Sequence, residues 1–335
     1  MLVNVGKLMS HTSTKGGGGV KHPFNPSLVD AWFMSGLSNS DKPSSIRGVK
    51  GNDLALKNFA YSLSSGFGKY TVDFTKYTGS NTTSNSISIY KEAGIDKGFA
   101  TIAYSQLESD IPSYSIEIKG LDSGQILYYY RNNEGLEKNV TYNKDGIYEL
   151  PICYKEGKKG ISAGVTINSV NNITITQLPS AYEGALVFDG VDDYGICTGL
   201  PILDDYTVVC RRVIENDTNV VASKSIVAGN GAFIFEYANN ATYSFSEYTS
   251  GLNMNLKDSV SYQTKNSYNG SVITVGTAND TDTLTLGIIR EKDSRLLKGA
   301  IYYFALYDKS LTPEEVEEEK VKLENYWEGG KNELA

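Results

Sequence analysis

The chain has 335 residues, enough for two or three domains, and its 40% hydrophobic and 21% charged residues exclude a disordered polymer. A net charge of −8 argues against nucleic acid as a partner of the body of the protein. No apolar run approaches the ~18 residues that cross a bilayer, so we expect no membrane partner either. The 24 tyrosines and 33 glycines favour strands and turns over helices.

Residues 1–27 form a basic, glycine-rich arm. No acidic residue occurs before Asp30, and four consecutive glycines let a backbone approach a partner surface closely. The arm lacks the apolar stretch of about 7–15 residues that marks a signal peptide, which predicts synthesis in the cytoplasm. We predict that the arm attaches the protein to a partner; a wrap against its own body is the alternative. The predicted attachment residues are Lys7, Lys15, Gly16, Gly17, Gly18, Gly19 and Lys21.

Short strand-like runs follow the arm. Leu28–Phe33 and Leu54–Phe59 are the first two. Further β-rich runs separated by turn residues fill residues 70–182, and about eight strands in roughly 110 residues fit a small antiparallel β-sandwich. These runs are Ser86–Tyr90, Phe99–Tyr104, Tyr114–Lys119, Ile126–Tyr130, Ile147–Ile152, Ala163–Ile167 and Ile173–Leu178.

The second half of the chain opens with a predicted hairpin. The apolar run Ala185–Phe188 leads into Asp189 and Gly190, and glycine accepts the positive φ of a tight turn. Tyr194 then starts the next strand. Later strands are predicted over Tyr206–Cys210, Ala232–Tyr237, Tyr243–Glu247, Ser271–Gly276, Leu284–Ile289 and Gly299–Leu306.

A C-terminal helix is predicted to start after Thr312. Thr312 is a good N-cap, Pro313 suits the first helical position, and Glu315 completes a capping box. Leu311 and Val316 stand at the positions of a hydrophobic staple. One face of this helix is predicted to dock on the sandwich, and it carries Val316, Lys320, Leu323 and Trp327.

Three segments resemble parts of LamG-like, or concanavalin A-like, jelly-roll domains. The string Ala185-Leu-Val-Phe-Asp-Gly-Val-Asp-Asp-Tyr194 resembles their FDGVDDYV signature, and Tyr307–Glu315 resembles their LYNRALTxEEI ending. Leu28–Phe33 occupies the place of their opening strand. The family has only a short connection between this strand and the signature, so the resemblance implies an insertion here.

The fold class that follows is all-β: a concanavalin A-like jelly-roll sandwich interrupted by an inserted antiparallel β-sandwich, with a short C-terminal helix. The predicted domains are the arm, 1–27; a discontinuous jelly roll, 28–69 plus 183–335; and the insertion, 70–182.

This arrangement also resembles a group of virion proteins from bacteriophages of gut bacteria. The resemblance implies a non-enzymatic head-fibre or capsid-decorating protein, synthesised in the host cytoplasm and located in the virion. Its partners would be other capsid or tail proteins and copies of itself, as a dimer or trimer. The alternative is a carbohydrate-binding adhesin, at a phage tail tip or on a cell surface, with a host glycan as its partner.

Catalytic groups are scarce in this sequence. The two histidines, His11 and His22, both lie in the arm, so the body cannot build a Ser-His-Asp triad or a histidine-based zinc site. The E-x-D-x-x-E strand typical of hydrolases of this fold is absent. We therefore expect no enzyme activity; a glycoside hydrolase would need two inward carboxylates about 5–10 Å apart.

No cofactor is expected, and calcium is the one candidate. Asp189, Asp192 and Asp193 are close in sequence, and carboxylate oxygens are ligands that Ca²⁺ prefers. The alternative, which we favour, is that Asp189 and Asp193 cap the turn by accepting backbone hydrogen bonds. The odd number and wide spacing of the cysteines predict free thiols at Cys153, Cys197 and Cys210.

Tyrosines in or near loops of the second half are candidates for glycan contact. Sugar binding needs exposed aromatic faces beside polar groups, although tyrosines in strands are more often packing or interface residues. The candidate residues are Tyr243, Tyr248, Tyr262 and Tyr268.

Overall fold

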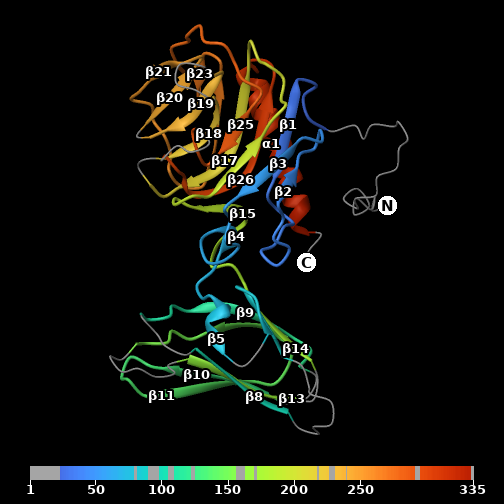
Figure 1. Cartoon of the computed structure of the whole chain (residues 1–335), viewed down its shortest axis with the longest axis vertical. Helices are drawn as coiled ribbons and strands as arrows, with labels where there is room; N and C mark the ends of the chain where they lie inside the picture. The colour runs from blue at the N-terminus through green and yellow to red at the C-terminus, as the bar shows by residue number, and fades with distance from the viewer. Residues whose placement is uncertain are drawn as a thin grey trace, which may run out of the picture. The chain divides into compact units, whose positions relative to one another are not determined.

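The computed structural model describes residues 23–78, 81–89, 98–104, 109–121, 125–155, 163–169, 172–216, 219–225, 231–238, 240–290 and 295–332. The chain divides into two compact units, shown in Figure 1. The first unit comprises residues 1–36, 44–57 and 190–335, and the second comprises 37–43 and 58–189. The first unit is therefore discontinuous in sequence, because the second interrupts it.

The boundaries of the units differ from the predicted domain boundaries. Residues 58–69 and 183–189, which the family resemblance assigns to the jelly roll, belong to the second unit. The reason is a strand pair: β4 (Gly66–Lys69) pairs with β15 (Ala181–Asp189), with Lys69 opposite Ala181 and Phe67 opposite Leu186. The segment that leads into the insertion and the segment that leads out of it are therefore hydrogen-bonded to each other as neighbouring strands.

Two antiparallel sheets build the first unit. In the first sheet the order β24-β23-β22-β17-β26 is continuous, and β1 also pairs with β26; the second sheet has the order β2-β3-β16-β25-β18-β19-β20-β21. The first-sheet strands are β1 (Leu28–Phe33), β17 (Thr207–Ile214), β22 (Ser259–Thr264), β23 (Ser267–Tyr268), β24 (Ser271–Val272) and β26 (Lys298–Tyr307). The second-sheet strands are β2 (Ser45–Arg47), β3 (Asp53–Lys57), β16 (Tyr194–Cys197), β18 (Val220–Lys224), β19 (Phe233–Tyr237), β20 (Ala241–Ser244), β21 (Glu247–Thr249) and β25 (Leu284–Leu286).

Side chains from the two sheets meet inside the first unit. The ring of Phe235 on β19 lies 6.2 Å from that of Tyr268 on β23. Nine of the ten residues of β26 are buried, as expected for a central strand covered on both faces. The predicted all-β sandwich with a C-terminal helix is confirmed.

Helix α1 (Pro313–Asn332) packs on the first sheet, and it starts at the residue that the capping pattern predicts. The Thr312 amide donates to Glu315 Oε2 at 2.9 Å, and the Glu315 amide donates to Thr312 Oγ1 at 3.3 Å, which is a complete capping box. Val316, Leu323 and Trp327 are buried. Among the described residues, no helix is long and apolar enough to cross a membrane.

The second unit contains two five-stranded antiparallel sheets, β11-β10-β13-β8-β5 and β12-β9-β14-β7-β6. Its own hydrophobic core draws on both sheets, with Tyr128 from β10 and Ile118 from β9, and every member lies between Val72 and Ile175. The elements are η1 (Phe74–Lys76), β5 (Tyr77–Thr78), β6 (Asn81–Thr82), β7 (Ser86–Ile89), β8 (Gly98–Tyr104), β9 (Tyr114–Lys119), β10 (Gln125–Arg131), β11 (Glu137–Tyr142), β12 (Gly146–Leu150), β13 (Ala163–Ser169) and β14 (Ile173–Gln177).

Replacing residues 72–180 with a short Gly/Ser linker should leave the first unit folded. The Ser180 amide donates to the Lys69 carbonyl at 2.6 Å, so the two ends of the excised segment are neighbours that a few residues can join. Tryptophan fluorescence during heating is the measurement, because both tryptophans, Trp32 and Trp327, are buried in the first unit. Loss of the cooperative transition would show that the first unit depends on the excised segment.

A tyrosine row on the second sheet and the polar network behind it

A hairpin at the edge of the second sheet presents two of the predicted tyrosines. A strand over Tyr243–Glu247 was expected, and this is wrong: β20 ends at Ser244 and β21 starts at Glu247. The two residues between them, Phe245 and Ser246, have φ of 46° and 68°, the positive values that a tight two-residue hairpin turn requires. The turn places Tyr243 directly opposite Tyr248 in the strand register.

Three tyrosines form what we call the tyrosine row: Tyr237 on β19, Tyr243 on β20 and Tyr248 on β21. The ring centroids of Tyr237 and Tyr243 are 5.4 Å apart with an interplanar angle of 76°, and those of Tyr243 and Tyr248 are 5.0 Å apart at 50°. Tyr248 is 47% exposed, and the other two are partly exposed. Burial, followed by the neighbouring phenols Tyr237 and Tyr248, raises the pKa of Tyr243.

Arg295 borders the row at the Tyr237 end. Its Nη1 donates to Tyr237 Oη at 2.5 Å, and its guanidinium carbon lies 5.3 Å from the ring centroid of Tyr237. An isolated bridge between Ile288 and Leu296 holds the chain next to Arg295. The row therefore combines aromatic surface, phenol hydroxyls and one cationic group.

Tyr237 is turned outward by an irregularity in β19. Phe235 and Glu236 are consecutive and both buried, and the register between β19 and β20 shifts between Ile234 and Tyr237. Glu236 has a φ of 53°, which is rare for a residue with a side chain. This bulge sends the Glu236 carboxylate into the sandwich and leaves Tyr237 on the outer face.

A buried ion pair holds the bulge. Arg212 on β17 donates from Nε to Glu236 Oε2 at 2.5 Å and from Nη2 to Glu236 Oε1, and both side chains are fully buried. Tyr268 Oη donates to Glu236 Oε1 at 2.6 Å, and Arg212 Nη1 donates to Ser259 Oγ at 2.6 Å. Burial alone would lower the pKa of Arg212, but attraction to Glu236 outweighs it and raises that pKa. The pair links the first sheet to the second.

A second group of hydrogen bonds crosses the same interior. Gln263 on β22 donates from Nε2 to Tyr206 Oη at 2.6 Å and to the Tyr243 carbonyl at 2.9 Å, and Tyr206 Oη bonds to Ser244 Oγ at 3.0 Å. Thr242 Oγ1 donates to Gln263 Oε1. The backbone of the hairpin that carries Tyr243 is therefore fixed from inside the sandwich.

Sugar contact needs exposed rings, and the prediction is wrong for two of the four candidate tyrosines because their side chains are buried. Tyr268 is 1% exposed, and its hydroxyl is committed to Glu236. Tyr262 is 9% exposed, and Lys320 of α1 lies over its ring with Nζ 4.8 Å from the centroid. Both residues lie on the first sheet, where the sandwich interior and α1 cover them. Glycan contact at Tyr243 and Tyr248 stays a prediction.

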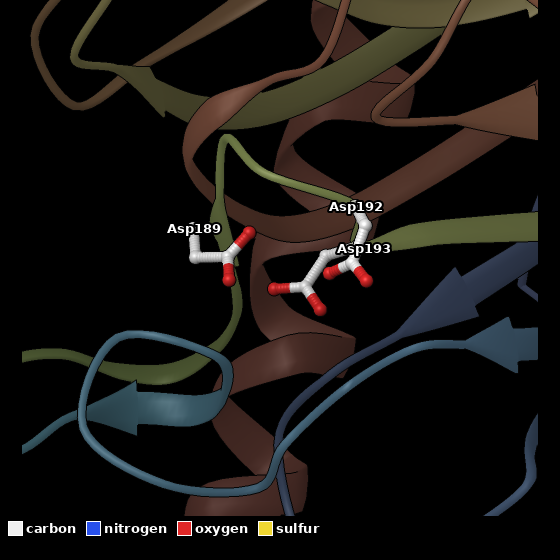
Figure 2. A group of neighbouring side chains, drawn as sticks. All are labelled: Asp189, Asp192 and Asp193. Carbon is white, nitrogen blue, oxygen red and sulfur yellow. The ribbon is translucent and has the colours of Figure 1, made fainter. Parts of the chain in front are cut away.

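The three aspartates predicted as a calcium candidate do come together. Figure 2 shows them around the turn that joins β15 to β16. One carboxylate oxygen from each of Asp189, Asp192 and Asp193 lies within 4.8 Å of the others, and Asp193 is buried whereas Asp192 is exposed. Gly190 in the turn has a φ of 80°, and a Cβ there would lie 2.8 Å from Lys298 Cβ, so glycine is required. Three carboxylates suit a hard cation and equally suit a capped turn.

Calcium should leave the melting temperature of the protein unchanged, because we expect hydrogen bonds to hold this turn. A site that binds the ion would instead stabilise the folded state by about 2.7 kcal/mol at a hundredfold excess over the dissociation constant. The measurement is thermal unfolding in millimolar calcium and in chelator, for the natural chain and for Asp192→Asn. A calcium-dependent rise that Asp192→Asn removes would establish the cation site.

Asp30, like Glu236, is a buried carboxylate that the sequence did not single out. Asp30 on β1 is fully buried and accepts hydrogen bonds at 2.8 Å from the amides of Ala31, Lys50 and Asn52 and from Asn52 Nδ2. A Cβ on Gly48 would lie 2.4 Å from Asp30 Oδ1, so the loop closes tightly over this carboxylate. Its hydrogen-bond donors are Ala31 on the same strand and Lys50 and Asn52 in the loop, which indicates a structural role.

None of the three cysteines forms a disulfide, as their spacing predicts, and the structure places all three in the interior. Burial raises the pKa of Cys197 to about 12 and also raises the pKa of Cys153 and Cys210. The thiolate is the reactive form, so burial disfavours reaction of these side chains at neutral pH.

No protein-family model and no curated protein matches this chain. A solved structure to which it is similar is described as "Truncated AlyQ with CBM32 and alginate lyase domains". The alignment covers 72% of this chain and 98% of that chain, with 8% sequence identity and a TM-score of 0.25. A likeness at this level carries no argument about ligand or activity. The LamG-like family therefore stays a prediction from the sequence motifs.

Proposed function

We propose that this chain is a non-enzymatic carbohydrate-binding protein and that the tyrosine row is its ligand face. The observation that supports the proposal is the row itself: three partly exposed rings on adjacent strands, with hydroxyls and Arg295 beside them. A tyrosine offers an apolar face and a polar tip, which complements a sugar ring with its C–H faces and hydroxyl rim. The row is also rigid before binding, since the interior network fixes its backbone, and rigidity lowers the entropy cost of association.

Tyr248→Ala should weaken glycan binding of the full chain about tenfold, because it removes the most exposed ring of the row, and the glycan array should show the loss as a lowered signal. Tyr129→Ala is the matched control, since Tyr129 is 39% exposed on β10 of the second unit and lies outside the row. A chain that binds no glycan on the array, or a Tyr248→Ala variant that binds as well as the natural chain, would contradict the proposal.

The proposal includes the absence of catalysis, for which the sequence is the support. With histidine confined to positions 11 and 22, the body has no imidazole for general acid–base chemistry. Incubation of the purified chain with any polysaccharide it binds should release no reducing ends. Turnover that a single carboxylate-to-amide substitution removes would contradict this part.

A structural role in a bacteriophage virion is the second candidate, and one observation favours it. The predicted attachment residues, from Lys7 to Lys21, lie outside the described residues. Just after residue 22, two contacts hold the chain against α1. Phe24 is buried with its ring 5.5 Å from that of Tyr326, and the Asn25 amide donates to Glu319 Oε2 at 3.0 Å. The chain is therefore anchored on α1 directly after residue 22. An arm that attaches the protein to a partner needs such an anchor at its base.

Deleting residues 1–22 should leave a folded, soluble protein that fails to join its particle or oligomer. The Phe24 and Asn25 contacts with α1 remain in this variant, so the melting temperature should stay close to that of the natural chain. Co-sedimentation with particles and light scattering measure the assembly. Normal incorporation together with a lowered melting temperature would show instead that the arm only wraps its own body.

A further inference from the structure

We infer that the tyrosine row binds an interior stretch of a neutral or acidic polysaccharide chain and not a single terminal sugar. This inference rests on the proposed function and names the ligand class of the same face.

The geometry of the row requires an extended ligand. Each ring comes from a different strand, and the successive centroids are 5.4 Å and 5.0 Å apart. Tyr243 lies directly opposite Tyr248, whereas Tyr237 lies opposite Ala241, two residues along β20 from Tyr243. The row therefore runs diagonally from β19 to β20 and then straight across to β21, the last strand of the second sheet. A ligand that contacts Tyr237 and Tyr248 together must extend in that direction as well.

The inclination of the rings favours a chain of linked rings over one flat ring. The planes of Tyr237, Tyr243 and Tyr248 turn by 76° and then 50° along the row, so they do not make one flat platform. A single sugar ring can stack on one of these faces only. Successive sugar units of a polysaccharide change orientation along the chain and can meet the rings in turn.

Charge selects among extended ligands. Of the described residues on the outer face of β19–β21, Ile234 and the row carry no charge, and Arg295 adds a cation at one end. Glu247 stands opposite Ser244, whose hydroxyl bonds to Tyr206 inside the sandwich, so Glu247 belongs to the side facing away from the row. The face thus suits a hydroxyl-rich chain that is neutral or acidic and disfavours a basic peptide.

Chain-length dependence tests the inference. The full chain is first screened against mannan, xylan and polygalacturonate, and oligosaccharides of the polymer that binds are then titrated by calorimetry, from the monosaccharide to the hexasaccharide. Affinity should rise at least about tenfold between the monosaccharide and the trisaccharide, because each added unit meets another ring, and then level off. Tyr248→Ala should lower the trisaccharide affinity about tenfold, Tyr248→Phe should keep it, and Tyr129→Ala should change nothing.

The outcomes separate this inference from the proposed function. A monosaccharide that binds as tightly as the hexasaccharide, with its binding still weakened in Tyr248→Ala, would overturn the extended ligand and leave carbohydrate binding in place. Tighter binding of a basic peptide than of any of these polymers would overturn the ligand class. Binding of no carbohydrate at all would overturn both.

Discussion

Replacing Arg212 with methionine should lower the free energy of unfolding of the first unit by about 3–5 kcal/mol, because it leaves the Glu236 carboxylate buried without its cation. Glu236 is fully buried, and after the substitution it would keep the hydrogen bond from Tyr268 but lose both from the guanidinium. Urea denaturation followed by tryptophan fluorescence measures the effect, since Trp32 and Trp327 both report on the first unit.

Two further variants show whether burial is the cause. Arg47 pairs with Asp53 at 2.9 Å, but both side chains are more than half exposed, so Arg47→Met should cost no more than about 1 kcal/mol. The double variant Arg212→Met/Glu236→Leu should recover most of the loss, because an apolar pair can replace a buried ion pair. If Arg212→Met is as mild as Arg47→Met, the interior pair does not stabilise the sandwich.

Trp327→Ala should cost about 3–5 kcal/mol of stability, the usual effect of removing a buried aromatic ring. Trp327 is 3% exposed, its ring meets that of Tyr302 edge-on at 5.4 Å, and the guanidinium carbon of Arg211 lies 4.5 Å from its centroid. Arg211 also pairs with Glu324 of α1. The substitution therefore removes the ring against which this paired guanidinium packs. Calorimetric melting of the full chain is the measurement.

The same helix supplies the control for this variant. Val321 is 60% exposed on α1, so Val321→Ala should change the stability by less than about 0.5 kcal/mol. Trp327→Phe should fall between the two, since it keeps an aromatic ring against Tyr302. A melting temperature that Trp327→Ala leaves unchanged would mean that α1 does not depend on this contact.

Elements that are marked by their local sequence were predicted well, whereas strands that bury polar side chains were not predicted. The capping box around Thr312 and the apolar run Leu28–Phe33 determine their structure through neighbours in sequence. The strands β18 and β22 were missed because their buried residues include Lys224 and Gln263, which hydrophobic patterning assigns to loops. The buried Lys224 ammonium is satisfied by groups distant in sequence: Asp280 Oδ2 at 2.5 Å and the carbonyls of Pro201 and Thr281 accept from its Nζ.

The candidate site was predictable only in part. Tyr243 and Tyr248 were named from the sequence because they lie near a turn, but Tyr237 and Arg295 were not. Tyr237 faces outward through a bulge that Arg212 holds, and Arg295 reaches the row from the segment between β25 and β26, 58 residues from Tyr237 in the sequence. Tyr268 was misassigned because nothing in its local sequence indicates the buried carboxylate to which it bonds.

The two faces of the second sheet have different roles: inward-facing side chains hold the strands in place, and outward-facing side chains form the tyrosine row. Directional bonds to Thr242, Ser244 and Glu236 fix the backbone from within, so the outward positions at Ile234, Tyr243 and Tyr248 do not have to hold the strands in place. Substitutions at these outward positions can therefore accumulate without altering the frame that displays them. A sheet built in this way is a natural scaffold for diversification, in which related chains, or a designed library, exchange the outer residues to meet new ligands while the core sequence stays constant.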